Sequence, residues 1–288
     1  MLFAVEGFIT IFIAIISFFT CTDRPETARW LSEEEKKLAV DRVISERLGA
    51  TEVLDKITLP KLKRGLSSPV TILTTAIYLL DNVTVQGLAF FAPTIVRTIY
   101  PEYSVIQQQL HTAPPYVVGA VFTLFFPYMS WKTNKKAIWF VPCGCLIMIG
   151  YIIFLSTSSG SARYAATFLI ASGAFPFGAM ANSHVSANTI SDTSRSTAIA
   201  AVILGGHIGG FCSSWSFTPK DGPSYPIGNG LNLGTSTTLT ILSLVMIFWI
   251  RHDNRKRDKV DENSILAGMT TEEIQRLDWH HPSFRWRL

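Results

Sequence analysis

The chain has 288 residues, of which 48% are hydrophobic and 16% are charged, and its mean hydropathy is +0.29. Soluble domains carry about a quarter of charged residues, so this composition excludes an ordinary soluble protein and indicates a membrane protein. The formal net charge of +4 arises from basic residues in the gaps between apolar runs, where they form no stripe along a helix, so nucleic acid is not an expected partner.

Seven apolar runs approach the 20 or so residues that a membrane-spanning helix needs. They cover, within a few residues, 1–20, 69–95, 114–131, 137–156, 162–184, 197–217 and 231–250. The sequence therefore predicts an all-α transmembrane fold with about seven spans. The first run starts without basic residues, contains Glu6 and is followed by no small-residue cleavage site, so we interpret it as a spanning helix and not as a signal peptide.

Lysine and arginine predict the orientation of these spans. Of the 25 basic residues, 22 lie in alternate gaps, and the other three are Arg97, Arg163 and Lys220. Since cytoplasmic loops carry the excess of basic residues, the richer gaps and the C-terminus are expected to be cytoplasmic. The predicted divisions are a first helix at 1–20, a cytoplasmic central loop at 21–66, a six-helix bundle at 67–251 and a cytoplasmic tail at 252–288.

The central loop begins TDRPETARWLSEEEKKLAVDRVISERL, in which serine and threonine precede acidic residues and basic residues come later. This order is typical of short amphipathic helices with capped starts. We interpret the segment as a solvated charged loop, and a specific partner site is the alternative.

The second run carries four polar residues that the helical period places on one broad face. Tyr78, Asn82 and Gln86 recur every four residues, and Asp81 follows Tyr78 by three. We expect this face to line a cavity and to bind substrate. An aspartate at mid-membrane depth costs about 2.5–3.5 kcal/mol on insertion scales, so Asp81 is a functional candidate, with a neutral acid bonded to a neighbouring helix as the alternative.

Two prolines begin the third run, and polar residues lie in or just after the fifth run. Pro114 and Pro115 are expected at a helix start, where the missing amides cost nothing, or at a gate hinge. Asn182, His184 and Asn188 could bind a carboxylate or ureide, although hydrogen bonding between helices is the alternative role.

The sixth run contains two interleaved G-x-x-x-G pairs, Gly205/Gly209 and Gly206/Gly210. This spacing lets helix backbones approach closely in lipid, so the four glycines are predicted to pack helices. His207, between them, is interpreted as a packing or helix-bridging residue.

Cysteines and catalytic motifs indicate neither a metal site nor an enzyme. Cys21, Cys143, Cys145 and Cys212 form no C-x-x-C or Cys/His set, so no metal, disulfide framework or cofactor is expected. G-x-S-x-G, H-E-x-x-H and nucleotide-loop motifs are absent from the sequence, and so is a recurring filter element that would indicate a channel. Polar residues spread over several spans favour a secondary transporter. A seven-span receptor is the alternative, although its first cytoplasmic gap would be unusually long.

Several motifs, in order, resemble the C-terminal part of fungal anion:cation symporters of the major facilitator superfamily, such as the allantoate, nicotinate and pantothenate permeases. They are PETARWLSEEEK, FFAPTIV, TAPPY, GGHIGG, DGPSYPIGNGLNLG and the ending HHPSFRWRL. Two departures are WKTNKK, where such proteins often carry an aspartate–arginine pair, and the turn from Asp192 to Arg195, which retains part of a basic element.

The resemblance implies a twelve-span protein in which the first run here corresponds to the sixth span. On that basis we expect a proton-coupled symporter of a small organic anion, such as a vitamin or ureide carboxylate, in the plasma membrane. Five preceding spans would be missing, which implies that this chain alone is a non-functional fragment.

Overall fold

A computed structural model describes residues 2–22, 25–45, 57–217, 219–222, 225–261, 266, 268–269 and 277–288, and within these ranges the regular elements are all helical. The chain divides into two compact units, Met1–Asp55 and Lys56–Leu288.

The first unit contains two helices and one 3₁₀ turn. These are α1 (Leu2–Thr20), η1 (Pro25–Thr27) and α2 (Glu33–Ser45). A capping box starts α2: the Ser32 amide donates to the Glu35 carboxylate over 2.9 Å, and the Glu35 amide donates to the Ser32 hydroxyl over 3.3 Å. The bonds from the Ser32 amide and hydroxyl lower the pKa of Glu35.

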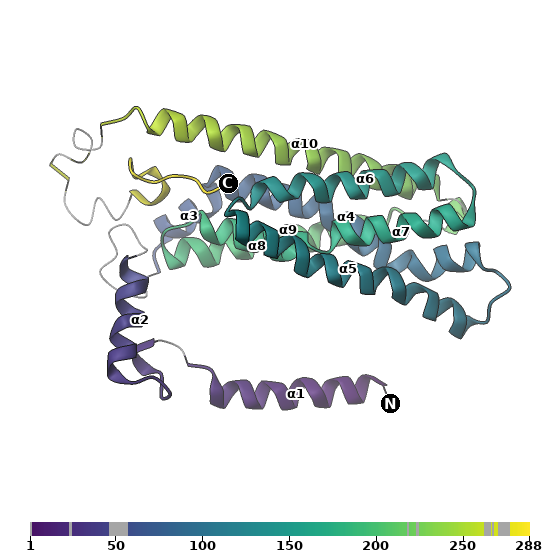
Figure 1. Ribbon diagram of the computed structural model, residues 1–288, viewed down its shortest axis with the longest axis horizontal. Coiled ribbons are helices and arrows are strands. Elements are labelled where there is room, and N and C mark those ends of the chain that lie inside the picture. The colour runs from purple at the N-terminus through teal and green to yellow at the C-terminus, as the bar shows by residue number, and fades with distance from the viewer. Residues whose placement is uncertain are drawn as a thin grey trace. The chain divides into compact units, whose positions relative to one another are not determined.

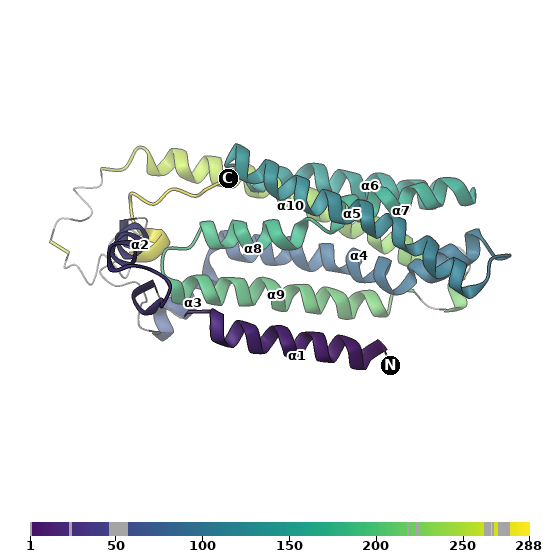
Figure 2. The same cartoon turned by 60° about the horizontal axis from the view of Figure 1, so that its bottom comes forward.

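The second unit is a bundle whose long helices run side by side along its length (Figures 1 and 2). Its elements are α3 (Leu59–Ser67), α4 (Pro69–Ile99), α5 (Val105–Thr133), η2 (Ala137–Trp139), α6 (Phe140–Ser156), α7 (Gly160–Ala174), α8 (Phe177–Ala187), α9 (Asp192–Ser214), η3 (Pro219–Asp221), α10 (Pro226–Arg257) and η4 (Asp278–His280).

Six helical segments among the described residues are long and apolar enough to cross a membrane. They are Phe3–Thr20, Pro69–Ala89, Ala137–Ser156, Gly160–Ala187, Asp192–Ser214 and Pro226–Arg257. The remaining predicted span, 114–131, lies in α5, which has 29 residues but begins with a polar turn that contains three glutamines. All seven predicted runs are therefore helical.

The prediction that Pro114 and Pro115 open a helix is wrong, because α5 begins nine residues earlier. Ser104 and Gln107 form a capping box that starts the helix, and both prolines lie inside it. Pro115 has no amide to donate to the His111 carbonyl. The Tyr164 hydroxyl of α7 donates to that carbonyl instead, over 3.0 Å, so this half-buried backbone group keeps a partner.

The predicted fifth run is divided between two helices. α7 ends at Ala174 and α8 begins at Phe177, with Pro176 at the N-cap of α8. Because proline lacks the amide that would continue the ladder of α7, the helix breaks at this point and the chain resumes as α8.

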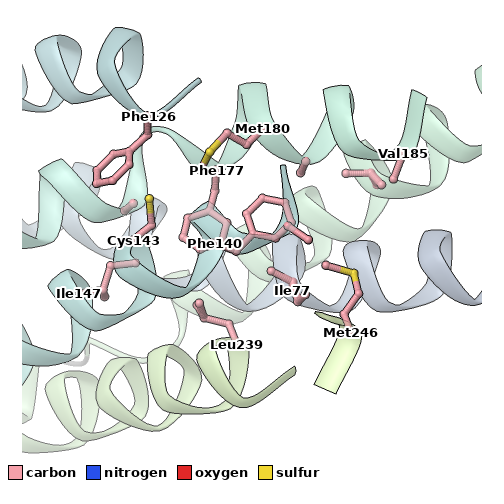
Figure 3. Packing of buried hydrophobic residues seen from close by; sticks show 14 of the residues in the cluster. Ile77, Phe126, Phe140, Cys143, Ile147, Phe177, Met180, Val185, Leu239 and Met246 are labelled. Carbon is pink, nitrogen blue, oxygen red and sulfur yellow. The ribbon is translucent and has the colours of Figure 1, made fainter. Parts of the chain in front are cut away.

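The core of the bundle is formed by apolar side chains from all its long helices, and those labelled in Figure 3 come from α4, α5, α6, α8 and α10. The rings of Phe140 and Phe177 stack with centroids 5.3 Å apart. Gly173 of α7 lies directly against the Cys143 carbonyl of α6, where a side chain would not fit. Cys143 is a buried part of this core, whereas Cys145 is exposed.

Candidate functional site

Asp81 lies in the middle of α4 and is 1% exposed. Neither of its carboxylate oxygens has a hydrogen-bond partner among the described residues. One turn away, the Thr84 hydroxyl donates to the Asn232 side chain of α10 over 3.2 Å, so this side of α4 faces α10.

Tyr78, Asn82 and Gln86 lie on a different side of α4, where they face the glycines of α9. A Cβ atom on Gly206 would lie 2.6 Å from the Tyr78 ring, and one on Gly210 would lie 3.2 Å from the Gln86 side chain. All three polar residues are partly exposed. The single face expected for the four residues is therefore divided, with the carboxyl buried inside the bundle and the other three against α9.

The four glycines of α9 all approach α4. A Cβ atom on Gly205 would lie 2.6 Å from Thr75, and one on Gly209 would overlap the Leu79 carbonyl oxygen. Glycine is required at position 209 because a backbone atom, which cannot move aside as a side chain can, fills the space. His207 was expected to pack between helices, but it is exposed because the glycines occupy the face of α9 that meets α4.

Of Asn182, His184 and Asn188, which lie in or just after the fifth predicted run, the structure brings the last two together: the Asn188 side-chain nitrogen lies 3.4 Å from His184 Nδ1. Asn182 is partly buried and donates to the Gly178 carbonyl of its own helix over 2.9 Å. The His184 ring is fully buried, meets the Phe140 ring edge to face at 5.8 Å and has no partner at Nε2. Asn188 lies one turn further and binds the backbone of Arg287.

Two buried polar side chains near Gly87 were not singled out from the sequence. Ser213 of α9 and Asn232 of α10 are both 0% exposed, and the Ser213 hydroxyl and the Asn232 amide nitrogen have no partner among the described residues. Both atoms approach the site of a Gly87 Cβ, at 3.1 and 3.3 Å. An asparagine within an otherwise apolar predicted span is the signal that would have identified Asn232.

The polar side chains described above can donate or accept hydrogen bonds, and the Asp81 carboxyl can also exchange a proton. Asp81 has a buried carboxyl without a fixed counter-ion among the described residues, which is suited to taking up and releasing a proton. Among the described residues, no three histidine, cysteine or acidic side chains lie close enough together to hold a metal ion.

The sequence is similar to fungal transporters along most of its length. It is 24% identical to an uncharacterized transporter of Schizosaccharomyces pombe over 90% of this chain and 51% of the relative. It is 26% identical to a major facilitator-type transporter of Emericella nidulans over 99% of this chain and 57% of the relative. It is also 26% identical to the high-affinity nicotinic acid transporter of Saccharomyces cerevisiae, over 71% of this chain and 38% of the relative.

The chain thus spans about half the length of the curated relatives it matches. No family model and no solved structure match it. The names of the relatives point to transport and not to catalysis. With its long apolar helices, the chain is an all-α integral membrane protein, and it is similar to fungal transporters that include a major facilitator-type transporter.

Proposed function

We propose that this chain is the C-terminal part of a proton-coupled symporter of the fungal anion:cation symporter family, and that its substrate is a small organic anion such as a vitamin or ureide carboxylate. The similarity to transporters, one of them named for nicotinic acid, supports the substrate class. The proton is the proposed coupling ion, and no cofactor is part of the proposal.

The main support for the proposal is the burial of the Asp81 carboxyl without a hydrogen-bond partner among the described residues. A carboxyl that is 1% exposed and lacks a hydrogen-bond donor is costly to keep ionised in a membrane. Uptake of a proton removes this cost, and release of the proton restores it. Asp81 can therefore link the protonation state of the bundle to its conformation.

The proposed substrate contacts are Tyr78, Asn82, Gln86, Asn182, His184 and Asn188. Of these, Tyr78, Asn82 and Gln86 are the most accessible to a substrate, because they are partly exposed along α4 beside the glycines of α9, which have no side chains to cover them. An aromatic ring and two amides offer donors and stacking surface to a planar carboxylate. His184 and Asn188 are fully buried, so they contribute only if the bundle opens at their end.

We further propose a plasma-membrane location with a cytoplasmic C-terminus and with cytoplasmic segments at 21–66 and 252–288. The alternation of basic residues supports this orientation. α10 extends to Arg257, so the proposed tail begins with helix.

Replacement of Asp81 tests the coupling. The chain is joined behind the N-terminal half of the Schizosaccharomyces pombe relative, and radiolabelled nicotinate or allantoate uptake is measured. Asp81→Asn keeps the shape but cannot titrate, so we expect uphill uptake to be lost while exchange of substrate across the membrane is partly retained. Glu102→Gln, an acid-to-amide change at an exposed loop, is the matched control and should leave both activities unchanged.

Two results would contradict a coupling role for Asp81. One is uphill uptake by Asp81→Asn at the rate of the parent protein. The other is the absence of folded Asp81→Asn protein from the membrane, which would make the residue structural.

A further inference from the structure

Residues 277–288, which we call the strap, follow α10 in the chain and turn back along one end of the bundle (Figure 1). The strap begins with η4 and continues as irregular chain to Leu288. It contacts α3, α9, α10, the C-cap of α8 and the turn before α6, so one short segment touches the ends of several helices.

Two asparagines hold the strap by its backbone. The Asn254 side chain accepts from the Trp286 amide and donates to the Trp286 carbonyl, both over 2.9 Å. The Asn188 side chain accepts from the Arg287 amide over 2.7 Å and donates to the Arg287 carbonyl over 3.0 Å. Backbone groups of successive residues point to opposite sides of an extended chain, so the strap lies between α8 and α10.

Buried aromatic side chains of the strap add contacts with the bundle to these backbone hydrogen bonds. Trp286 is 3% exposed, and its indole donates to the Asp253 carboxylate over 2.7 Å. Phe284 is also buried and meets the Trp286 ring edge to face at 4.9 Å. The Arg257 guanidinium lies 5.6 Å from the Trp286 ring centre and donates to the Trp279 carbonyl over 3.0 Å.

Three further bonds tie the strap to other helices. The Ser194 hydroxyl of α9 donates to the Asp278 carboxylate over 2.6 Å, and the Trp279 indole donates to the Arg64 carbonyl of α3 over 3.2 Å. The Lys136 amide, before α6, donates to the Leu288 carbonyl oxygen. While the strap is bound, α3, α8, α9 and α10 cannot separate at this end without breaking these bonds.

This arrangement has the features of a peptide-binding site. Backbone bonds supply affinity and pockets for particular side chains supply specificity, as in the recognition of extended peptides. We propose that the ends of α8 and α10 form a docking site for an extended aromatic peptide, and that the strap occupies this site as a detachable ligand that holds this end of the bundle closed. The proposal shares Asn188 with the proposed substrate contacts and otherwise depends on neither the substrate nor proton coupling.

The test separates the strap from a bundle that has already folded. A specific protease site is placed between residues 262 and 276, the purified protein is immobilised in nanodiscs and cut, and the freed strap is washed away. A fluorescent synthetic peptide of residues 277–288 is then added and its binding is measured by anisotropy. We expect saturable binding to the cut protein and roughly tenfold weaker apparent binding to the uncut protein, because a tethered strap competes at high effective concentration.

Variant peptides distinguish this recognition from adhesion of an apolar peptide. Trp286→Ala should weaken binding by roughly tenfold or more, because it removes the central buried anchor. Methylation of the Arg287 amide nitrogen should also weaken binding roughly tenfold, because Asn188 then loses its donor. Arg287→Ala is the matched control: its side chain is exposed, so binding should change by about twofold or less.

The proposal is overturned if the cut strap cannot be washed away or exchanged, which would make it an integral part of the fold. It is also overturned if washed protein that keeps its thermal unfolding transition binds no peptide, or binds the Trp286→Ala peptide equally well. None of these readouts involves transport, so failure here is distinguishable from failure of the proposed function.

Discussion

His280 stacks on Trp279 in the strap, with ring centroids 3.7 Å apart, and faces Arg64, Arg257 and Asp278. Burial lowers its pKa below the ordinary value of 6.5, the two arginine charges lower it further, and Asp278 opposes them. A detached strap therefore binds a proton more readily than a docked one. Docking is strongest above the ordinary pKa and weakens as the pH falls through 6.5 toward the lowered value.

Acidification should accordingly promote release of the strap. In the cut protein, we expect the dissociation rate of the labelled strap to rise between about pH 7.5 and pH 5.5. His280→Gln stays neutral over this range, so it should remove most of the pH dependence. If the dissociation rate of the His280→Gln strap depends on pH as strongly as that of the parent strap, the pH effect belongs to another group, such as His281.

At the level of single residues, the sequence identified polar side chains within the apolar spans but not the neighbours that each of them meets. Asp81 was recognised as a buried acid, but its direction depends on which helices pack beside α4. A step of three residues turns a helix by about 300°, so Asp81 points about 60° away from Tyr78 and meets different neighbours. Their proposed roles in transport stay predictions. The function of Asn188 in holding Arg287 was not foreseeable, because the partner is backbone about a hundred residues away.

Among the helices, α4 and α9 pack closely, because Gly209 of α9 lies against the Leu79 backbone of α4. Gly209→Ala should destabilise the bundle by about 1–3 kcal/mol, because the new methyl group overlaps the Leu79 backbone. Gly210→Ala meets only the flexible Gln86 side chain, and Gly234→Ala meets nothing within 4 Å, so both are matched controls. Helix propensity favours alanine by up to about 1 kcal/mol, which makes Gly234→Ala neutral or stabilising.

Thermal unfolding in detergent checks this order. The expected melting temperatures fall from Gly234→Ala through Gly210→Ala to Gly209→Ala. Equal melting temperatures for Gly209→Ala and Gly234→Ala would show that α4 and α9 are not in close contact in the membrane protein.

Existence of the helices was predictable, whereas their ends were not. Apolar runs long enough to cross a bilayer identify helices whatever their neighbours. The start of α5 depends on the cap at Ser104, which lies in a polar stretch outside the apolar run. The break at Pro176 depends on whether neighbours support a kinked helix or two helices. The strap has no periodic pattern, so only its tertiary contacts reveal it.

For the whole molecule, the alternation of basic residues predicts which ends face the cytoplasm. A reporter inserted after Asp261 should be protected from external protease in intact cells, and one near Glu102 should be cleaved. The insertion at 261 leaves the strap sequence intact. Reporters that are both cleaved or both protected would contradict the proposed arrangement of spans.

Transport by these 288 residues alone is a separate question. In secondary transporters of this architecture the substrate lies between two repeats that rock against each other. The chain spans about half the length of its relatives, so we expect liposomes that contain only this chain to show no proton-driven uptake of labelled nicotinate. Robust and saturable uptake would show that the chain is sufficient, for example as a homodimer.

The bond from the Tyr164 hydroxyl to the His111 carbonyl makes two distant positions interdependent. With proline at position 115, the His111 carbonyl accepts its hydrogen bond from the Tyr164 phenol and not from a helical amide. Any other residue at 115 could restore the helical amide, and the phenol would become dispensable. Loss of the phenol alone leaves the His111 carbonyl without a hydrogen bond, which lowers stability. Replacing residues 115 and 164 together avoids this loss. Among natural homologues, proline at 115 should therefore occur together with tyrosine at 164, while sequences without that proline should vary freely at the second position.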